Sequence, residues 1–140
     1  DAQSGMFVTL FYVIIDSKKL TLRYVNAGHN PPLLFKEGLS EPVLLETEGI
    51  ALGVIEDINL EETEIELKKD NIVVFYTDGV TESINEQEEQ FGVERFIEVI
   101  KKNHYLPAKE IIEQVQQAII TFCDKQPQFD DITLMILKAL

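Results

Sequence analysis

The chain has 140 residues, of which 45% are hydrophobic and 26% are charged, enough for one core and too few for two ordinary domains. With 25 acidic against 12 basic residues the net charge is −13, which disfavours nucleic acid and anionic membrane surfaces as partners. No apolar run approaches the roughly 20 residues of a membrane span, no signal-peptide pattern is present, and a lone cysteine excludes an intrachain disulfide, so we expect one cytoplasmic domain over residues 1–140.

The first half of the chain has the pattern of β-strands. Residues 6–15 (MFVTLFYVII) form an almost unbroken apolar run, which is typical of a strand buried on both faces. A turn at residues 16–19 and an alternating segment at residues 20–26 complete a predicted hairpin. Further strands are predicted at residues 32–35, 41–46, 63–68 and 72–76.

The second half has a helical period. Apolar residues recur at helical spacing in two stretches, which are separated by the residues before Pro107. The stretches comprise Val93, Phe96, Ile97 and Ile100, and then Ile111, Ile112, Val115, Ala118, Ile119 and Phe122. Pro107 suits the first turn of the second helix, and residues 132–140 form a last strand. The order of elements predicts an α+β domain, with helices packed outside antiparallel sheet.

Carboxylates stand at the ends of two predicted strands. Asp78 and Gly79 follow the strand at residues 72–76, and Asp130 and Asp131 precede the last strand. The two positions are 52 residues apart, so only the fold can bring them together. Carboxylate oxygens suit a hard cation such as Mg²⁺ or Mn²⁺. The alternative is ordinary punctuation, because Asp-Gly is a common turn pair and Asp often precedes a strand.

Taken together, several segments resemble one family. They are FVTLFYVIID, LRYVNAGHNPPLLF, IALGVIED, IVVFYTDGVTES with FG following, and FDDITLMIL. In this order and spacing they are similar to the SpoIIE-like and RsbU-like branch of the metal-dependent (PPM-type) protein phosphatases. The resemblance covers essentially the whole chain from Met6 to Leu137.

The resemblance implies a serine/threonine phosphoprotein phosphatase built as an antiparallel β-sandwich flanked by helices (αββα), with two Mn²⁺ or Mg²⁺ ions at one end. Asp78 and Asp130 match the family's metal ligands, Gly79 is adjacent to the first, and Asp131 is a support or weaker ligand. Such an ion pair would activate a water molecule for attack on phosphorus. By family analogy, the substrate is a phosphorylated regulatory protein, typically an anti-sigma-factor antagonist of the STAS type.

His29 has two interpretations. Near a metal pair it would be a catalytic proton donor or would hydrogen-bond a ligand. Alternatively, it is a turn histidine whose polar groups are satisfied by the backbone. His104 stands near a predicted helix C-terminus, where a partial positive charge is favourable, and has no predicted catalytic role.

The resemblance breaks down at the start of the chain. The family's pattern begins earlier, with a Gly-Asp segment that completes the metal pair, and residues 1–6 do not match it; Asp1 is not a substitute. We therefore expect a domain that is incomplete at its N-terminus. An uncovered sheet edge would favour a homodimer, and activity is not expected of the isolated chain without the other ligands.

Two other functions compete with this prediction. One is a noncatalytic, regulatory domain of the same fold that binds a phosphoprotein. The other is a haloacid dehalogenase-like phosphatase, whose nucleophilic aspartate would stand where this chain has Tyr76. Tyrosine cannot form the aspartyl-phosphate, which argues against that class.

Overall fold

The computed structural model describes residues 6–38, 41–124, 126 and 130–140. Its elements, in chain order, are β1 (Leu10–Asp16), β2 (Thr21–Ala27), β3 (Leu33–Phe35), β4 (Val43–Leu44), β5 (Thr63–Glu66), β6 (Ile72–Tyr76), α1 (Asp78–Thr81), α2 (Gly92–Asn103), α3 (Ala108–Cys123) and β7 (Leu134–Lys138). The predicted α+β class is confirmed, and the predicted strand at residues 72–76 coincides with β6. The sequence reading missed α1, a single turn that it treated as loop. No helix in the described ranges is long and apolar enough to span a membrane.

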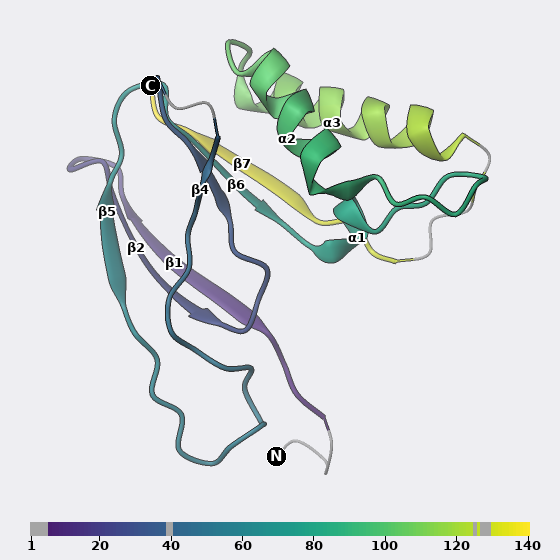
Figure 1. The fold of residues 1–140 in the computed structure, drawn as a ribbon. Helices are drawn as coiled ribbons and strands as arrows, with labels where there is room; N and C mark the ends of the chain where they lie inside the picture. The colour runs from purple at the N-terminus through teal and green to yellow at the C-terminus, as the bar shows by residue number, and fades with distance from the viewer. Residues whose placement is uncertain (1–5, 39–40, 125, 127–129) are drawn as a thin grey trace.

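The strands form two antiparallel sheets. One has the order β1-β2-β5 and the other β4-β3-β6-β7. Figure 1 shows α2 and α3 together on one side of the four-stranded sheet, away from β1, β2 and β5. The described part of the chain is therefore layered as helices, four-stranded sheet and three-stranded sheet.

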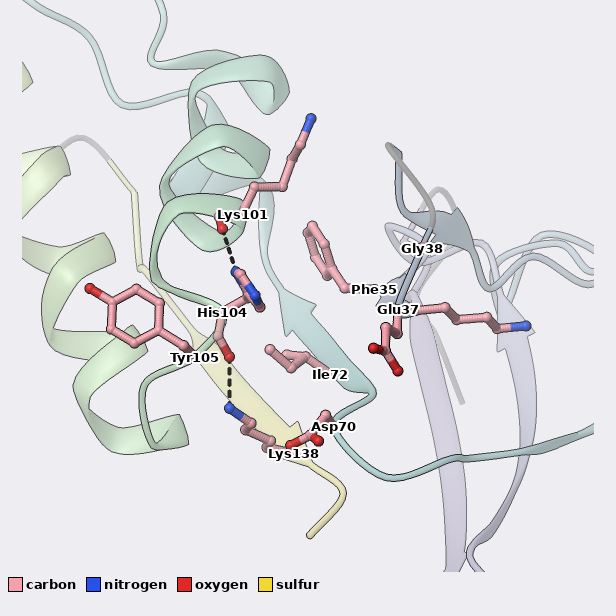
Figure 2. Close-up of a pocket in the computed structure, with 10 residues that line it drawn as sticks. Phe35, Glu37, Gly38, Asp70, Ile72, Lys101, His104, Tyr105 and Lys138 are labelled. Carbon is pink, nitrogen blue, oxygen red and sulfur yellow. Dashed lines mark hydrogen bonds between the residues drawn. The ribbon is translucent and has the colours of Figure 1, made fainter.

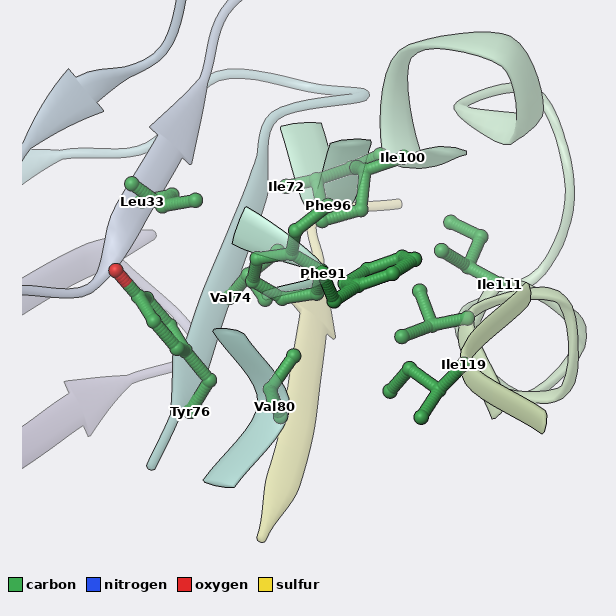
Figure 3. Close-up of a cluster of buried hydrophobic side chains, with 11 residues drawn as sticks. Leu33, Ile72, Val74, Tyr76, Val80, Phe91, Phe96, Ile100, Ile111 and Ile119 are labelled. Carbon is green, nitrogen blue, oxygen red and sulfur yellow. The ribbon is translucent and has the colours of Figure 1, made fainter. Parts of the chain in front are cut away.

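Two hydrophobic clusters hold the layers together. Between helices and sheet, Phe96 is completely buried, and its ring centroid lies 5.0 Å from that of Tyr76 on β6 (Figure 3). Between the two sheets, Phe11 on β1 packs against Tyr24 and Phe75, at centroid distances of 5.3 Å and 5.8 Å. Strand β6 contributes alternate side chains to both clusters, because successive residues of a strand point to opposite faces. It is thus the central, best-buried strand.

The prediction that residues 6–15 are buried on both faces is wrong for β1. Phe11 and Val13 point into the cluster between the sheets, but the alternate residues Leu10, Tyr12 and Ile14 are 43%, 57% and 41% exposed. The strand lies at the edge of its sheet, and the helices pack on the other sheet. An apolar run indicates that a strand favours burial on both faces. It does not indicate whether other elements of the described chain pack on both faces.

The helix ends are close to their predicted positions. Pro107 stands immediately before α3, at its N-cap position, rather than inside the first turn. Its carbonyl accepts a hydrogen bond from the Ile111 N–H at 3.1 Å, so the missing proline N–H costs the helix nothing. His104 caps the C-terminus of α2, as predicted, and its Nδ1 lies 2.8 Å from the Lys101 carbonyl oxygen.

Candidate metal centre

Strand β6 places Asp78 at the surface between two buried anchors. The strand before it is largely buried, and Val80, two residues after it, is completely buried. Asp78 itself is exposed and begins α1. Its Oδ1 accepts a hydrogen bond from the Gly79 N–H at 3.1 Å. A solvent-facing carboxylate is therefore carried on backbone that the core fixes on both sides.

The segment before β7 meets the end of β6. The last rung between the two strands pairs Tyr76 with Leu134. Beyond it, the Thr77 N–H donates to the Thr133 carbonyl at 3.1 Å, and the Thr77 hydroxyl donates to the Asp131 carbonyl at 3.1 Å. The fold thus joins the two predicted aspartate segments, which are 54 positions apart at this contact.

Gly79 allows this approach to be close. A Cβ atom at Gly79 would lie 2.6 Å from the Asp131 carbonyl oxygen, nearer than real Cβ contacts come. The two chain segments are thus in backbone contact where the residue lacks a side chain. In the sequence, the Asp-Gly pair indicates a turn or a metal ligand, and the structure shows that the glycine is needed for close packing.

The candidate ligands are carboxylates, which suit a hard divalent cation, but they are few. Asp78, Asp130 and Asp131 are all exposed carboxylates, and the Asp130 Oδ1 accepts the Asp131 N–H at 2.7 Å. Oxygen ligands of this kind are what Mg²⁺ and Mn²⁺ prefer. No group of three or more His, Cys, Asp or Glu residues within the described residues has the arrangement of a metal site. The aspartates fit as part of a ligand set, and Asp1 lies outside the described residues.

His29 lies in the β2–β3 connection and is bonded within its own turn. Its N–H donates to the Asn26 Oδ1 at 2.8 Å, and its carbonyl accepts from the Asn26 Nδ2 at 2.9 Å. The ring Nδ1 lies 3.0 Å from the Asn30 carbonyl oxygen. Because Leu33 pairs with Val74, this connection lies toward the end of β6 that carries Asp78. The bonding matches the structural interpretation of His29, and the location leaves its ring near the candidate site's end of the sheet.

A cavity of about 570 Å³ lies at the other end of β6 (Figure 2). Phe35 and Ile72 line it from the sheet, and His104 lines it from the end of α2. Lys138 also lines it, but its ammonium donates to the carbonyls of His104 and Leu106 at 2.7 Å and 3.0 Å. None of the predicted site residues borders this cavity. The cavity therefore lies away from the candidate metal centre.

The sequence reading missed one residue of this region. Thr77 makes two side-chain hydrogen bonds to the segment before β7, since its hydroxyl also accepts the Thr133 N–H at 3.0 Å. A hydroxyl residue directly before Asp-Gly was the available signal. It carried no weight in the sequence, because threonine is common in strands and turns alike.

Comparison with known proteins gives a consistent family. A family model described as "Stage II sporulation protein E (SpoIIE)" matches residues 1–140. Protein IcfG of Synechocystis sp. is 34% identical over 132 residues, covering 94% of this chain and 20% of IcfG. Phosphoserine phosphatase RsbU of Bacillus subtilis is 27% identical over 140 residues, covering 99% of this chain and 41% of RsbU. The chain thus spans less than half the length of these relatives.

Solved structures share the fold. The SiaA-PP2C domain of Pseudomonas aeruginosa superposes with a TM-score of 0.76 at 22% identity, over 91% of this chain and 50% of that one. The phosphatase domain of SpoIIE from Bacillus subtilis gives a TM-score of 0.64 at 17% identity, over 94% of this chain and 56% of that one. Both strands beside β6 are antiparallel to it. This pairing and the family match exclude the haloacid dehalogenase-like alternative. The chain belongs to the SpoIIE family, in the SpoIIE-like and RsbU-like branch of the metal-dependent PPM-type protein phosphatases.

Proposed function

We propose that this chain is part of a metal-dependent phosphatase that hydrolyses phosphoserine or phosphothreonine on a regulatory protein. One observation carries the proposal, namely the contact that joins the Asp78 segment to the Asp131 segment at one end of the sheet. Two relatives are named phosphoserine phosphatases, RsbU and RsbP of Bacillus subtilis. The contact supports a shared role for carboxylates that no local structure would bring together.

Asp78, Asp130 and Asp131 would hold Mn²⁺ or Mg²⁺ in this proposal, with Asp131 the weaker ligand. When bound, two ions would supply Lewis-acid activation of water and neutralise the phosphoryl oxygens. The chain's own contribution is positional: buried β6 and Val80 fix Asp78, and the β6–β7 pairing fixes the Asp131 segment. Three carboxylates cannot complete the shells of two ions, so further ligands would come from polypeptide outside the described residues.

The substrate we propose is a phosphorylated regulatory protein of the STAS type, acting with this enzyme in the cytoplasm. The exposure of Asp78, Asp130 and Asp131 supports a protein substrate, because a phosphorylated side chain on another protein could reach them. The chain's net charge of −13 favours a partner that presents basic residues around its phosphorylated side chain.

His29 has a secondary place in the proposal. If the Nδ1–H donates to the Asn30 carbonyl, Nε2 would be the ring atom available to bond a ligand, and it would protonate a leaving alkoxide only when it also carries a proton. Replacement by Gln separates the two interpretations. A proton donor predicts a loss of kcat with thermal stability unchanged, whereas a turn residue predicts lower thermal stability with kcat unchanged.

The main test is Mn²⁺-dependent turnover of an aryl phosphate and of a phosphoserine protein. It uses this chain and a longer version that includes the residues encoded upstream, with Mn²⁺ binding measured by calorimetry. We expect turnover in the longer version, its loss in Asp78→Asn, and unchanged turnover in Glu113→Gln, which removes an exposed carboxylate on α3. Turnover that survives Asp78→Asn would contradict the proposed centre.

The alternative function is a noncatalytic domain that binds a phosphoprotein. The small ligand set in the described residues favours it. Binding of a phosphoserine protein by both versions, with no turnover at any Mn²⁺ concentration, would establish this alternative in place of the phosphatase.

A second copy of the chain is the partner we propose for the open side of the sandwich. Strands β1 and β7 are edge strands of the two sheets, and they lie on the same side, because Phe11 of β1 packs against Phe75, the rung partner of Met135. Leu10, Tyr12 and Ile14 form an apolar stripe beside the edge of β1 that no described strand pairs. Edges of this kind pair readily with another strand.

A further inference from the structure

The hydroxyl of Thr77 replaces a backbone carbonyl in the β6–β7 ladder. In an antiparallel ladder, every second pair of opposed residues exchanges two N–H···O=C bonds. At the rung after Tyr76–Leu134, the Thr77 N–H still donates to the Thr133 carbonyl, at 3.1 Å. The return bond from the Thr133 N–H goes to the Thr77 Oγ1, at 3.0 Å, and not to the Thr77 carbonyl. The Thr77 hydroxyl thus accepts the bond that the Thr77 carbonyl would accept in a regular ladder.

The Thr77 carbonyl is used elsewhere. It accepts the Val80 N–H at 3.1 Å, which begins the turn of α1 that carries Asp78. Threonine at the N-cap of a helix ordinarily uses its hydroxyl to bond that helix's own N–H groups. Here Thr77 is the N-cap of α1 and makes no such bond. Its hydroxyl is committed across the sheet instead, where it also donates to the Asp131 carbonyl at 3.1 Å.

We infer that Thr77 is a positioning residue that fixes the Asp131 segment relative to Asp78, an inference that rests on the proposed metal centre. The hydroxyl accepts from Thr133 and donates to Asp131, so it fixes the backbone on both sides of Ile132. The residue that follows Thr77 is Asp78 itself. The Thr77 side chain therefore adds to the β6–β7 pairing in setting the spacing of the two carboxylate segments, without itself contacting the metal or the substrate.

A merely structural role predicts a different pattern from a positioning role. Loss of the two hydrogen bonds of the Thr77 hydroxyl lowers stability in either case. Only a positioning residue also changes metal affinity. Residues that orient metal ligands through hydrogen bonds typically affect metal affinity by about 10–100-fold. Valine keeps the shape of threonine and removes both bonds, whereas serine keeps the hydroxyl.

The experiment compares Thr77→Val, Thr77→Ser and Thr121→Val in the full chain and in the upstream-extended version. Thr121 is a matched control, since its hydroxyl also donates one bond, to the Gln117 carbonyl at 2.7 Å, and accepts one, from the Gln117 Nε2 at 3.2 Å. Mn²⁺ affinity is measured by calorimetry, and amide hydrogen exchange at Thr133 by NMR without metal. Each readout is independent of turnover.

We expect Thr77→Val to weaken Mn²⁺ binding at least tenfold and to speed exchange of the Thr133 amide at least tenfold. Thr77→Ser should restore most of the Mn²⁺ affinity and of the amide protection, and Thr121→Val should change neither quantity.

Unchanged exchange at Thr133 in Thr77→Val would overturn the inference even if no version binds Mn²⁺. If Asp78→Asn abolishes Mn²⁺ binding while Thr77→Val preserves it, the inference fails and the proposed function stands. If Asp78→Asn leaves Mn²⁺ binding intact, the proposed centre fails.

Discussion

Gly79 is the residue whose size is most tightly limited at the candidate centre. We predict that Gly79→Ala destabilises the fold by about 1–3 kcal/mol, because the new Cβ would press on the Asp131 carbonyl and force the two segments apart. Urea unfolding measures the change in the free energy of unfolding, and calorimetry measures the accompanying loss of Mn²⁺ affinity. Gly38→Ala is the control: its Cβ would meet nothing within 4 Å, although its φ of +79° adds backbone strain. Equal Mn²⁺ affinity in the two variants would contradict the steric argument.

Cys123 should be a poorly reactive thiol. Burial raises its pKa above the ordinary 9.0, and a side-chain hydrogen bond with Ser83 opposes this in part. The neutral thiol is the favoured form, so this contribution to stability is present below pH 9 and is lost as the pH rises through the folded-state pKa. We expect alkylation by iodoacetamide near pH 8 to be several-fold slower in the folded chain than in urea. Equal rates would mean that the side chain is accessible and ordinarily acidic.

At the scale of elements, α2 depends on one aromatic side chain. Phe96 is fully buried between α2 and β6 and packs on Tyr76. We predict that Phe96→Ala lowers the free energy of unfolding by about 3–5 kcal/mol, through lost burial and the cavity that remains. Thermal and urea unfolding would measure this, with Glu94→Ala on the exposed face of α2 as the control, expected within about 0.5 kcal/mol of the parent. A loss below about 1 kcal/mol would show that the helix is not anchored there.

The elements themselves were largely predictable, and the exceptions have local causes. Strand β6 has a continuous apolar run and α2 and α3 have clear helical periods, so short-range patterning was sufficient. The single turn α1 was missed because four residues give no periodicity to detect. Burial of β1 was overestimated because hydrophobicity shows only which side chains favour burial. Whether they are buried depends on the other elements that pack against the strand.

For the whole molecule, the apolar stripe on β1 predicts self-association. Tyr12→Lys should weaken it at least tenfold, because a charge would be buried against a second copy's apolar strand. Analytical ultracentrifugation across a concentration series measures the monomer–dimer equilibrium. Ile120→Lys, at an equally exposed apolar position on α3, is the control and should leave the equilibrium unchanged. A parent chain that remains monomeric at every concentration would rule out the second copy as the partner of this edge.

The sequence by itself determined that strands fill the first half and helices the second, that Asp78 and Asp130, with Asp131 as a weaker ligand, are chemically suitable residues, and the family to which they point. These properties depend on residue type and spacing over short distances, which a linear pattern preserves. Only the tertiary structure decided that the two aspartate segments touch, that Gly79 must be small and that the Thr77 hydroxyl spans them. The pairing of β6 with β7 makes these contacts across 54 positions, and that long-range register depends on the packing of the whole core.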